Sequence, residues 1–99
     1  MAIFDWFDAK SANAFGLQLA ETFAQVLPLE AKLGDKKFSQ KAEAVLKKMQ
    51  IMIDEFKRAN KLNFYKKAQL GNSFKWRLKD FGLGDDYINL LTEWLLERL

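Results

Sequence analysis

The chain has 99 residues, of which 49% are hydrophobic and 29% are charged. This length fits one domain covering residues 1–99, and the abundance of apolar side chains is typical of a folded protein rather than a disordered one. Because the chain contains neither cysteine nor histidine, the composition excludes disulfide bonds, conventional zinc centres and catalytic units that rely on a thiolate or an imidazole.

The sequence gives no sign of secretion or membrane insertion. Residues 1–7 are mostly apolar, but Asp5 interrupts them and no cationic segment precedes them, which is unlike a secretory signal. No stretch approaches the roughly 18 uninterrupted apolar residues that cross a bilayer. We therefore predict no membrane partner and a cytoplasmic location.

Apolar residues recur at helical spacing along the whole chain. This pattern predicts an all-α fold, a small helical bundle of four main helices. The first helix is expected over residues 5–27, where Pro28 then ends or kinks it, because proline cannot donate the helical hydrogen bond. Its apolar stripe consists of Phe4, Phe7, Phe15, Leu19 and Val26.

The second predicted helix has the most regular pattern. Asp35 is suited to cap it, because a carboxylate accepts hydrogen bonds from the unpaired amides of the first turn. Apolar residues then alternate at spacings of four and three, as a heptad repeat requires. Leu46, Ile51 and Ile53 widen the apolar surface, which favours burial on two sides and is compatible with a homodimer. The repeat comprises Phe38, Ala42, Val45, Met49, Met52, Phe56 and Ala59.

The third segment, residues 62–81, has two apolar faces that do not coincide on a helical projection. Phe74, Leu78 and Phe81 share one direction, whereas the apolar residues of the first half centre on a direction rotated by more than roughly 100°. The stretch from Gly71 to Ser73 consists of residue types favoured in turns, and Ser73 can cap a following helix. We therefore predict two short helices, over residues 62–70 and 74–81, in preference to one continuous helix.

The last predicted helix follows two glycines. Gly82 and Gly84 are expected to stop the preceding helix, and Asp85 and Asp86 suit the positive end of the next helix dipole. The expected apolar face of this helix consists of Tyr87, Ile88, Leu91, Trp94 and Leu95.

Positive charge is concentrated in residues 57–79, which carry eight basic residues and no acid, while residues 80–99 carry five acids and one base. Two interpretations stay open. The basic segment either meets a partner, or the acidic C-terminal residues neutralise it within the fold. The candidate binding residues are Lys57, Arg58, Lys61, Tyr65, Lys66, Lys67, Lys75, Trp76, Arg77 and Lys79.

The aromatic residues of this segment also allow two interpretations. One continuous helix would align Tyr65, Gln69, Asn72, Trp76 and Lys79 in a stripe opposite the buried face. Such a stripe would suit a ligand, because aromatic rings stack on bases. The interpretation that we favour from sequence is that Tyr65 and Trp76 pack against a neighbouring helix, since aromatic residues of small bundles usually belong to the core.

The residue types argue against an enzyme. No phosphate-binding glycine motif occurs, and adjacent carboxylates such as Asp85 and Asp86 point about 100° apart on a helix rather than at a shared substrate. We expect a non-enzymatic protein, without metal or cofactor, that acts by contact with a protein partner or by self-association. Nucleic-acid binding through residues 57–79 is the alternative, because lysine and arginine neutralise phosphates. Protein contact ranks first because residues 80–99 could mask the basic segment.

Overall fold

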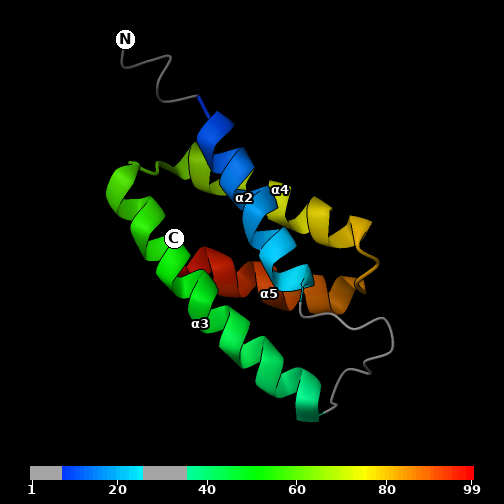
Figure 1. Ribbon diagram of the computed structural model, residues 1–99. Coiled ribbons are helices and arrows are strands. Elements are labelled where there is room, and N and C mark those ends of the chain that lie inside the picture. Colours follow the sequence, from blue (N-terminus) through cyan, green and yellow to red (C-terminus); the bar gives the residue numbers. More distant parts are fainter. Residues whose placement is uncertain (1–7, 26–35) are drawn as a thin grey trace.

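The computed structural model describes residues 8–25 and 36–99, and for residues 36–41 it describes the backbone alone. This part of the chain forms four α-helices and no strand (Figure 1). The prediction of an all-α bundle with four main helices is therefore confirmed. The helices are α2 (Lys10–Ala24), α3 (Lys36–Ala59), α4 (Phe64–Asp80) and α5 (Asp85–Arg98).

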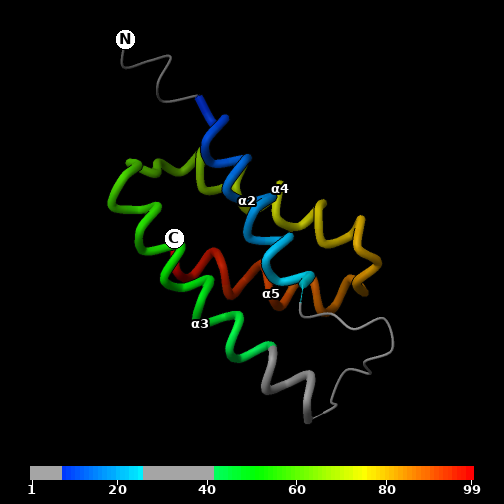
Figure 2. Tube along the Cα trace, in the orientation of Figure 1, coloured from blue at the N-terminus to red at the C-terminus, as the bar shows by residue number. Residues whose placement is uncertain are grey.

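Successive helices alternate in direction. The traces in Figures 1 and 2 show α2 and α4 running the same way, while α3 and α5 run back against them. The most extensive interface lies between α2 and α4, with α5 packed against α4 and α3 packed against α2. The central pair is thus formed by two helices that are not consecutive in the chain.

The core lies between the helices and receives side chains from all four. Fully burying a large apolar side chain contributes about 1.5–3 kcal/mol relative to leaving it in water. The largest fully buried side chains are Leu19 and Phe23 of α2, Met49 and Ile53 of α3, Leu70, Phe74 and Leu78 of α4, and Ile88 and Leu95 of α5.

The first helix is shorter than predicted. Asp8 and Ala9 precede it, so the expected start at Asp5 is wrong, and the helix ends at Ala24. The start has a local cause, because Oδ1 of Asp8 accepts a hydrogen bond from the backbone amide of Lys10 at 3.2 Å. A carboxylate in this position satisfies an amide that has no partner inside the helix.

One face of α2 is lined by small residues, a pattern that the sequence prediction missed. Ala12, Gly16 and Ala20 are all buried, at spacings of four. Phe15 and Leu19, the described members of the predicted apolar stripe, are buried as well. The small residues allow α4 to approach the backbone of α2 closely.

The second helix, Lys36–Ala59, departs from a strict heptad in its second half. Met49 is fully buried, but the next fully buried residue is Ile53, four positions on, while Met52 is only partly buried and Ala59 is exposed. A straight helix has 3.6 residues per turn, whereas a heptad repeat assumes 3.5. Along the helix the buried position therefore shifts from the heptad residue Met52 to the next residue, Ile53. The predicted helix is confirmed, but its buried face is not the heptad seam throughout.

Three sequence predictions lie outside the described residues or side chains. They concern the helix stop at Pro28, the cap at Asp35 and the burial of Phe38.

The predicted break in the third segment is wrong, because α4 runs without interruption from Phe64 to Asp80. Gly71 is buried inside this helix, where the side chain of Leu96 packs over it. Ser73 does not cap a helix. Its hydroxyl donates a hydrogen bond of 2.8 Å to Oδ1 of Asn13 on α2.

The cap of α4 lies earlier than predicted. Oδ1 of Asn63 accepts a hydrogen bond from the amide of Lys66 at 2.8 Å, which satisfies one of the free amides of the first turn. The apolar residues that broke the helical phase of the sequence are Phe64, Tyr65 and Ala68, and of these three Tyr65 alone packs against the core. Phe64 and Ala68 are both exposed.

The predicted stop after the third segment is confirmed. Gly82 has a φ of +86°, the left-handed conformation that glycine adopts without steric cost. Its amide donates to the carbonyl of Lys79 at 2.9 Å and the amide of Leu83 donates to that of Leu78 at 3.5 Å, the two hydrogen bonds of a Schellman motif.

The last helix begins with two acids, as predicted. Asp85 and Asp86 lie in the first turn of α5, where the helix dipole stabilises negative charge. The expected buried face is also confirmed, since Ile88, Leu91 and Leu95 are buried.

Candidate functional site

The structure divides the basic segment into two halves of different electrostatic character. In the C-terminal half, the guanidinium of Arg77 lies 3.4 Å from a carboxylate oxygen of Glu21 and 3.6 Å from one of Asp80. Nζ of Lys79 lies 3.7 Å from Oδ1 of Asp85. Neutralisation within the fold, one of the two interpretations left open by the sequence, thus applies to Arg77 and Lys79.

Most of the other cations of the segment, including Lys75 in its C-terminal half, form no ion pair with a described carboxylate. Nζ of Lys57 donates a hydrogen bond of 3.0 Å to the carbonyl of Arg98, which ties α3 to the end of α5. The remaining five cations form no ion pair with any residue that the structure describes. They are Arg58, Lys61, Lys66, Lys67 and Lys75.

Two of these cations occupy an unfavourable position. Lys66 and Lys67 lie in the first turn of α4, which contains no acid. The N-terminus of a helix carries a partial positive charge, so a cation there destabilises the helix by roughly 0.3–1 kcal/mol. Local violations of such rules tend to occur at functional sites.

Trp76 lies on the outward face of α4 and is 60% exposed. It follows Phe74 by two residues, which turns it by about 200° away from the buried face of a helix. The Nζ atom of Lys79 lies 4.8 Å from the centre of its indole ring, a cation–π contact. The prediction that Trp76 packs against a neighbouring helix is therefore wrong.

Tyr65 behaves differently from Trp76. It is partly buried and packs against the core, so the favoured sequence prediction holds for this residue. Because α4 is continuous, Tyr65 falls on the same helical stripe as Gln69, which is partly buried, and Asn72, which is exposed, although the ring of Tyr65 packs in part against the core. We call Tyr65, Gln69, Asn72 and Trp76 the α4 stripe.

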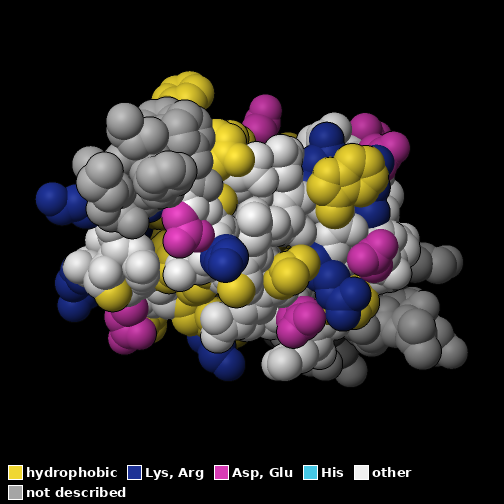
Figure 3. All heavy atoms as spheres, turned by 90° about the horizontal axis from the view of Figure 1, so that it is seen from above, with side chains coloured by type: hydrophobic (Ala, Val, Ile, Leu, Met, Phe, Trp, Pro, Cys, Tyr) yellow, Lys and Arg dark blue, Asp and Glu magenta, His cyan; other side chains and the backbone are white. Residues whose placement is uncertain are grey.

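Charges of both signs share the molecular surface. Figure 3 shows one face, on which lysine and arginine side chains are interspersed with aspartate and glutamate side chains. Around α4 the basic residues also spread over several directions, because five of them fall between positions 66 and 79 at irregular helical spacing. On the face shown in Figure 3 the cations therefore do not form one continuous basic patch.

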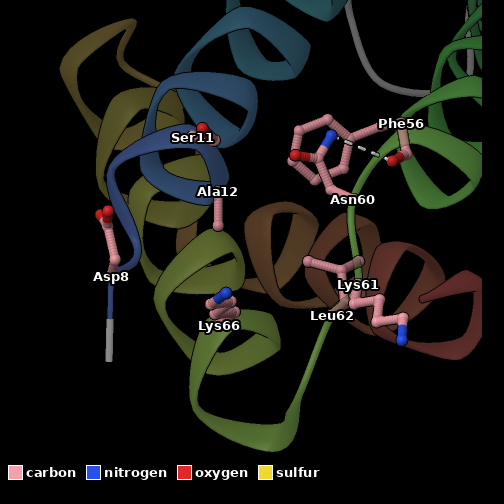
Figure 4. A pocket seen from close by; sticks show the side chains of 8 residues that line it. All are labelled: Asp8, Ser11, Ala12, Phe56, Asn60, Lys61, Leu62 and Lys66. Carbon is pink, nitrogen blue, oxygen red and sulfur yellow. Dashed lines mark hydrogen bonds between the residues drawn. The ribbon is translucent and has the colours of Figure 1, made fainter. Parts of the chain in front are cut away.

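A pocket of about 220 Å³ opens between the start of α2, the end of α3 and the start of α4. Figure 4 shows Lys66 below Ala12, across from Phe56 and Asn60, and Lys61 at the edge of the pocket with its ammonium group pointing away from the other labelled side chains. Its lining residues are Asp8, Ser11, Ala12, Phe56, Asn60, Lys61, Leu62 and Lys66.

Sequence reasoning missed two features of this region. Phe64, the first residue of α4, is 88% exposed. Its position directly after the capping Asn63 was the available signal, since side chains at the start of a helix often project beyond the bundle. The pocket was not predictable from spacing, because Asp8 and Ser11 are far from Lys66 in the chain.

The described residues contain neither a helix suited to span a membrane nor a cluster of metal-binding side chains. None of the helices in residues 8–25 and 36–99 is both long and apolar enough to cross a membrane. The same residues contain no group of three or more acidic side chains placed to hold a metal ion.

Comparison with models of protein families finds none that matches the chain, and comparisons with curated proteins and with solved structures find no match either.

Proposed function

We propose that the protein is a non-enzymatic binding protein that self-associates through the α4 stripe. The observation that carries this proposal is the exposure of Trp76, at 60% of its surface, on a regular helix. Tryptophan and tyrosine are enriched among residues that dominate binding energy at protein interfaces. Within the monomer the ring has a cation–π contact with Lys79 but is not buried against another helix, and a large exposed ring of this kind favours a contact with another molecule.

The charges around Trp76 favour a protein surface over a polyanion. Lys79 is paired with Asp85, and Asp80 accompanies Arg77, so the neighbourhood of the ring is close to neutral. Exposed aromatic rings without excess charge are typical of interface centres.

The α4 stripe reads the same in both directions: aromatic, amide, amide, aromatic. In an antiparallel pair of α4 helices, Tyr65 would therefore face Trp76 of a second copy and Gln69 would face its Asn72. Two-fold symmetric contacts require such self-complementarity, because each residue meets the same surface from which it comes. Amide side chains suit the centre of this contact, since each both donates and accepts hydrogen bonds.

The heptad face of α3 supports a dimer less well. Met49 and Ile53 are fully buried inside the monomer, and among the large apolar side chains described on α3 only that of Ile51 is exposed, at 61%. The apolar pattern that suggested a homodimer from sequence is thus largely used by the core.

A contact through one helix is small. Stable interfaces bury about 800 Å² on each partner, which a single pair of crossing helices does not reach. We therefore expect a reversible dimer with a dissociation constant in the micromolar range.

Sedimentation velocity over a concentration series up to about 100 µM tests the proposal. The unchanged protein should shift from monomer to dimer, and Trp76→Ala should remain monomeric. Leu90→Ala is the matched control, because Leu90 is a large apolar residue of similar exposure, 63%, on α5. A strict monomer at the highest concentration, or equal weakening by both variants, contradicts self-association through α4.

Nucleic-acid binding by the whole of residues 57–79 is the second candidate and has less support, because Arg77 and Lys79 already pair with carboxylates. The proposal includes no cofactor and no catalytic step. A cytoplasmic location stays a prediction, favoured by the absence of cysteine.

A further inference from the structure

The turn from α3 to α4 presents a surface that the proposed dimer does not use. Its residues are Arg58 at the end of α3, Lys61 in the turn, and Phe64, Lys66 and Lys67 in the first turn of α4. We call these five residues the α3–α4 corner. Its four cations lack an ion pair with any described residue, in contrast to Arg77 and Lys79 at the other end of α4.

A purely structural role within the monomer does not explain why these cations lie where they do. Lys66 and Lys67 lie at the positive end of the α4 dipole, with no acid in that turn to compensate them. An anion bound at the corner would turn this repulsion into attraction, because it would interact favourably with both the lysines and the helix terminus.

Phe64 adds an exposed aromatic ring on the side of α4 that carries Lys67. It is 88% exposed, so packing within the monomer does not account for it. On α4 it shares a side with Lys67, three residues on, whereas Lys66, two residues on, projects about 200° away from it. A free aromatic ring beside cations is the arrangement with which proteins bind single-stranded nucleic acid, the ring stacking on a base and the cations contacting the backbone.

The cations lie at different depths. Lys66 lines the pocket of about 220 Å³ together with Ser11 and Asn60, whereas Lys61 reaches outward from its edge (Figure 4). Asp8 also lines this pocket and accepts a hydrogen bond from the amide of Lys10. A recessed lysine is reached by a protruding phosphate group, while a flat lipid surface would contact only the outer cations.

We infer that the α3–α4 corner binds single-stranded nucleic acid. A backbone phosphate contacts Lys66 in the pocket, neighbouring phosphates contact Arg58, Lys61 and Lys67, and an unstacked base lies on the ring of Phe64. The site takes the sugar–phosphate backbone and any base, since stacking does not distinguish sequences. This inference is independent of self-association through Trp76.

Fluorescence anisotropy with labelled oligothymidylate and oligouridylate of about 16 nucleotides tests it. Four phosphate contacts predict a slope of about −3 for the logarithm of the binding constant against that of salt concentration. Binding should thus weaken by roughly 50-fold between about 50 and 200 mM salt. A difference between the two oligonucleotides would show whether the sugar is recognised.

Two triple variants distinguish binding at the corner from a general effect of net charge. The triple variant Lys61→Gln, Lys66→Gln, Lys67→Gln should weaken binding by at least about tenfold and reduce the salt slope to about −1. The control Lys47→Gln, Lys48→Gln, Lys75→Gln removes the same three charges, taking the formal net charge from +3 to 0 in each case. It should bind nearly as well as the unchanged protein.

Phe64→Ala tests the platform without affecting the core, because the side chain is almost fully exposed. It should weaken binding by about 5- to 150-fold, the range that corresponds to losing one base stack. Asp8→Asn keeps an oxygen that can accept from Lys10 and removes a negative charge from the pocket, so it should strengthen binding. Trp76→Ala should leave binding unchanged.

Several outcomes would overturn the inference. Absence of oligonucleotide binding at about 50 mM salt would do so directly. An equal loss of affinity in the two triple variants would show that binding depends on net charge alone and not on the corner. Full binding by Phe64→Ala would reject base stacking. Vesicles of phosphatidylserine, or polyglutamate, that compete with the oligonucleotide at similar charge concentration would assign the corner to a lipid surface or an acidic protein instead.

Discussion

Gly16 of α2 lies directly against the main chain of α4 at Leu70. A Cβ atom on Gly16 would come within 2.5 Å of the carbonyl oxygen of Leu70 and within 3.2 Å of the backbone nitrogen of Phe74. These neighbours are backbone atoms, so they cannot move aside as a flexible side chain would. The close approach of the two helices depends on the absence of a side chain at this position.

Gly16→Ala should therefore destabilise the protein. Overpacking of this kind costs about 1–3 kcal/mol, even though alanine favours a helix over glycine by about 1 kcal/mol. We expect the midpoint of thermal unfolding to fall by roughly 10 °C, measured by far-UV circular dichroism. An unchanged midpoint would mean that α2 and α4 lie further apart than described.

Gly71→Ala provides the contrasting case within the same bundle. A Cβ at Gly71 would lie 3.1 Å from Cδ2 of Leu96, the end of a side chain that is 45% exposed and can rotate. The helix propensity of alanine then dominates, at about 0.8–1.0 kcal/mol. We expect the thermal midpoint to rise by about 3–6 °C. A decrease as large as that of Gly16→Ala would contradict this difference between the two glycines.

Ser73 connects α4 to α2 through its hydrogen bond with Asn13, at 2.8 Å. Ser73→Ala should lower the free energy of unfolding by about 1 kcal/mol, because a partly buried hydrogen bond is lost. Urea denaturation of the single variants Ser73→Ala and Asn13→Ala and of the double variant measures the coupling. Additive effects of the two substitutions would show that this hydrogen bond contributes nothing to stability.

The sequence predicted which segments form helices better than it predicted where each helix ends and which side chains are exposed. Local chemistry was sufficient at Gly82, whose position after the third helix demands a left-handed residue, and at the acidic start of α5. It failed at Gly71 and Ser73, because turn-forming residue types are tolerated inside a helix when a neighbouring helix uses them. The absence of a side chain at Gly71 leaves room for Leu96, and the hydroxyl of Ser73 donates a hydrogen bond to Asn13.

Prediction of the candidate site was limited in the same way, because contacts between helices cannot be inferred from local sequence. The sequence located the cations, but pairing depends on which carboxylates the fold brings near, and Glu21 reaches Arg77 from another helix. Exposure of Trp76 followed from the continuity of α4, which the sequence prediction rejected. The pocket around Lys66 depends on three elements that meet only in the folded chain.

Ionisation of Tyr87 should make the free energy of unfolding decrease at alkaline pH. Its ring packs against the core, with its centre 6.0 Å from that of Phe23, and burial raises the pKa of its hydroxyl above the ordinary value of 10.0. In the unfolded chain the hydroxyl ionises at that ordinary value, while the folded protein holds its proton to higher pH.

Between these two pKa values the unfolded state binds fewer protons than the folded state, so the free energy of unfolding decreases as pH rises. The contribution of Tyr87 is fully present below pH 10.0 and is lost as the pH rises through its folded pKa. Tyr87→Phe keeps the ring and removes the titrating group, and it leaves every lysine in place as an internal control. Urea denaturation at about pH 9 and about pH 11 should show a smaller loss of stability for Tyr87→Phe than for the unchanged protein. Parallel losses in the two proteins would show that ionisation of Tyr87 is not linked to unfolding.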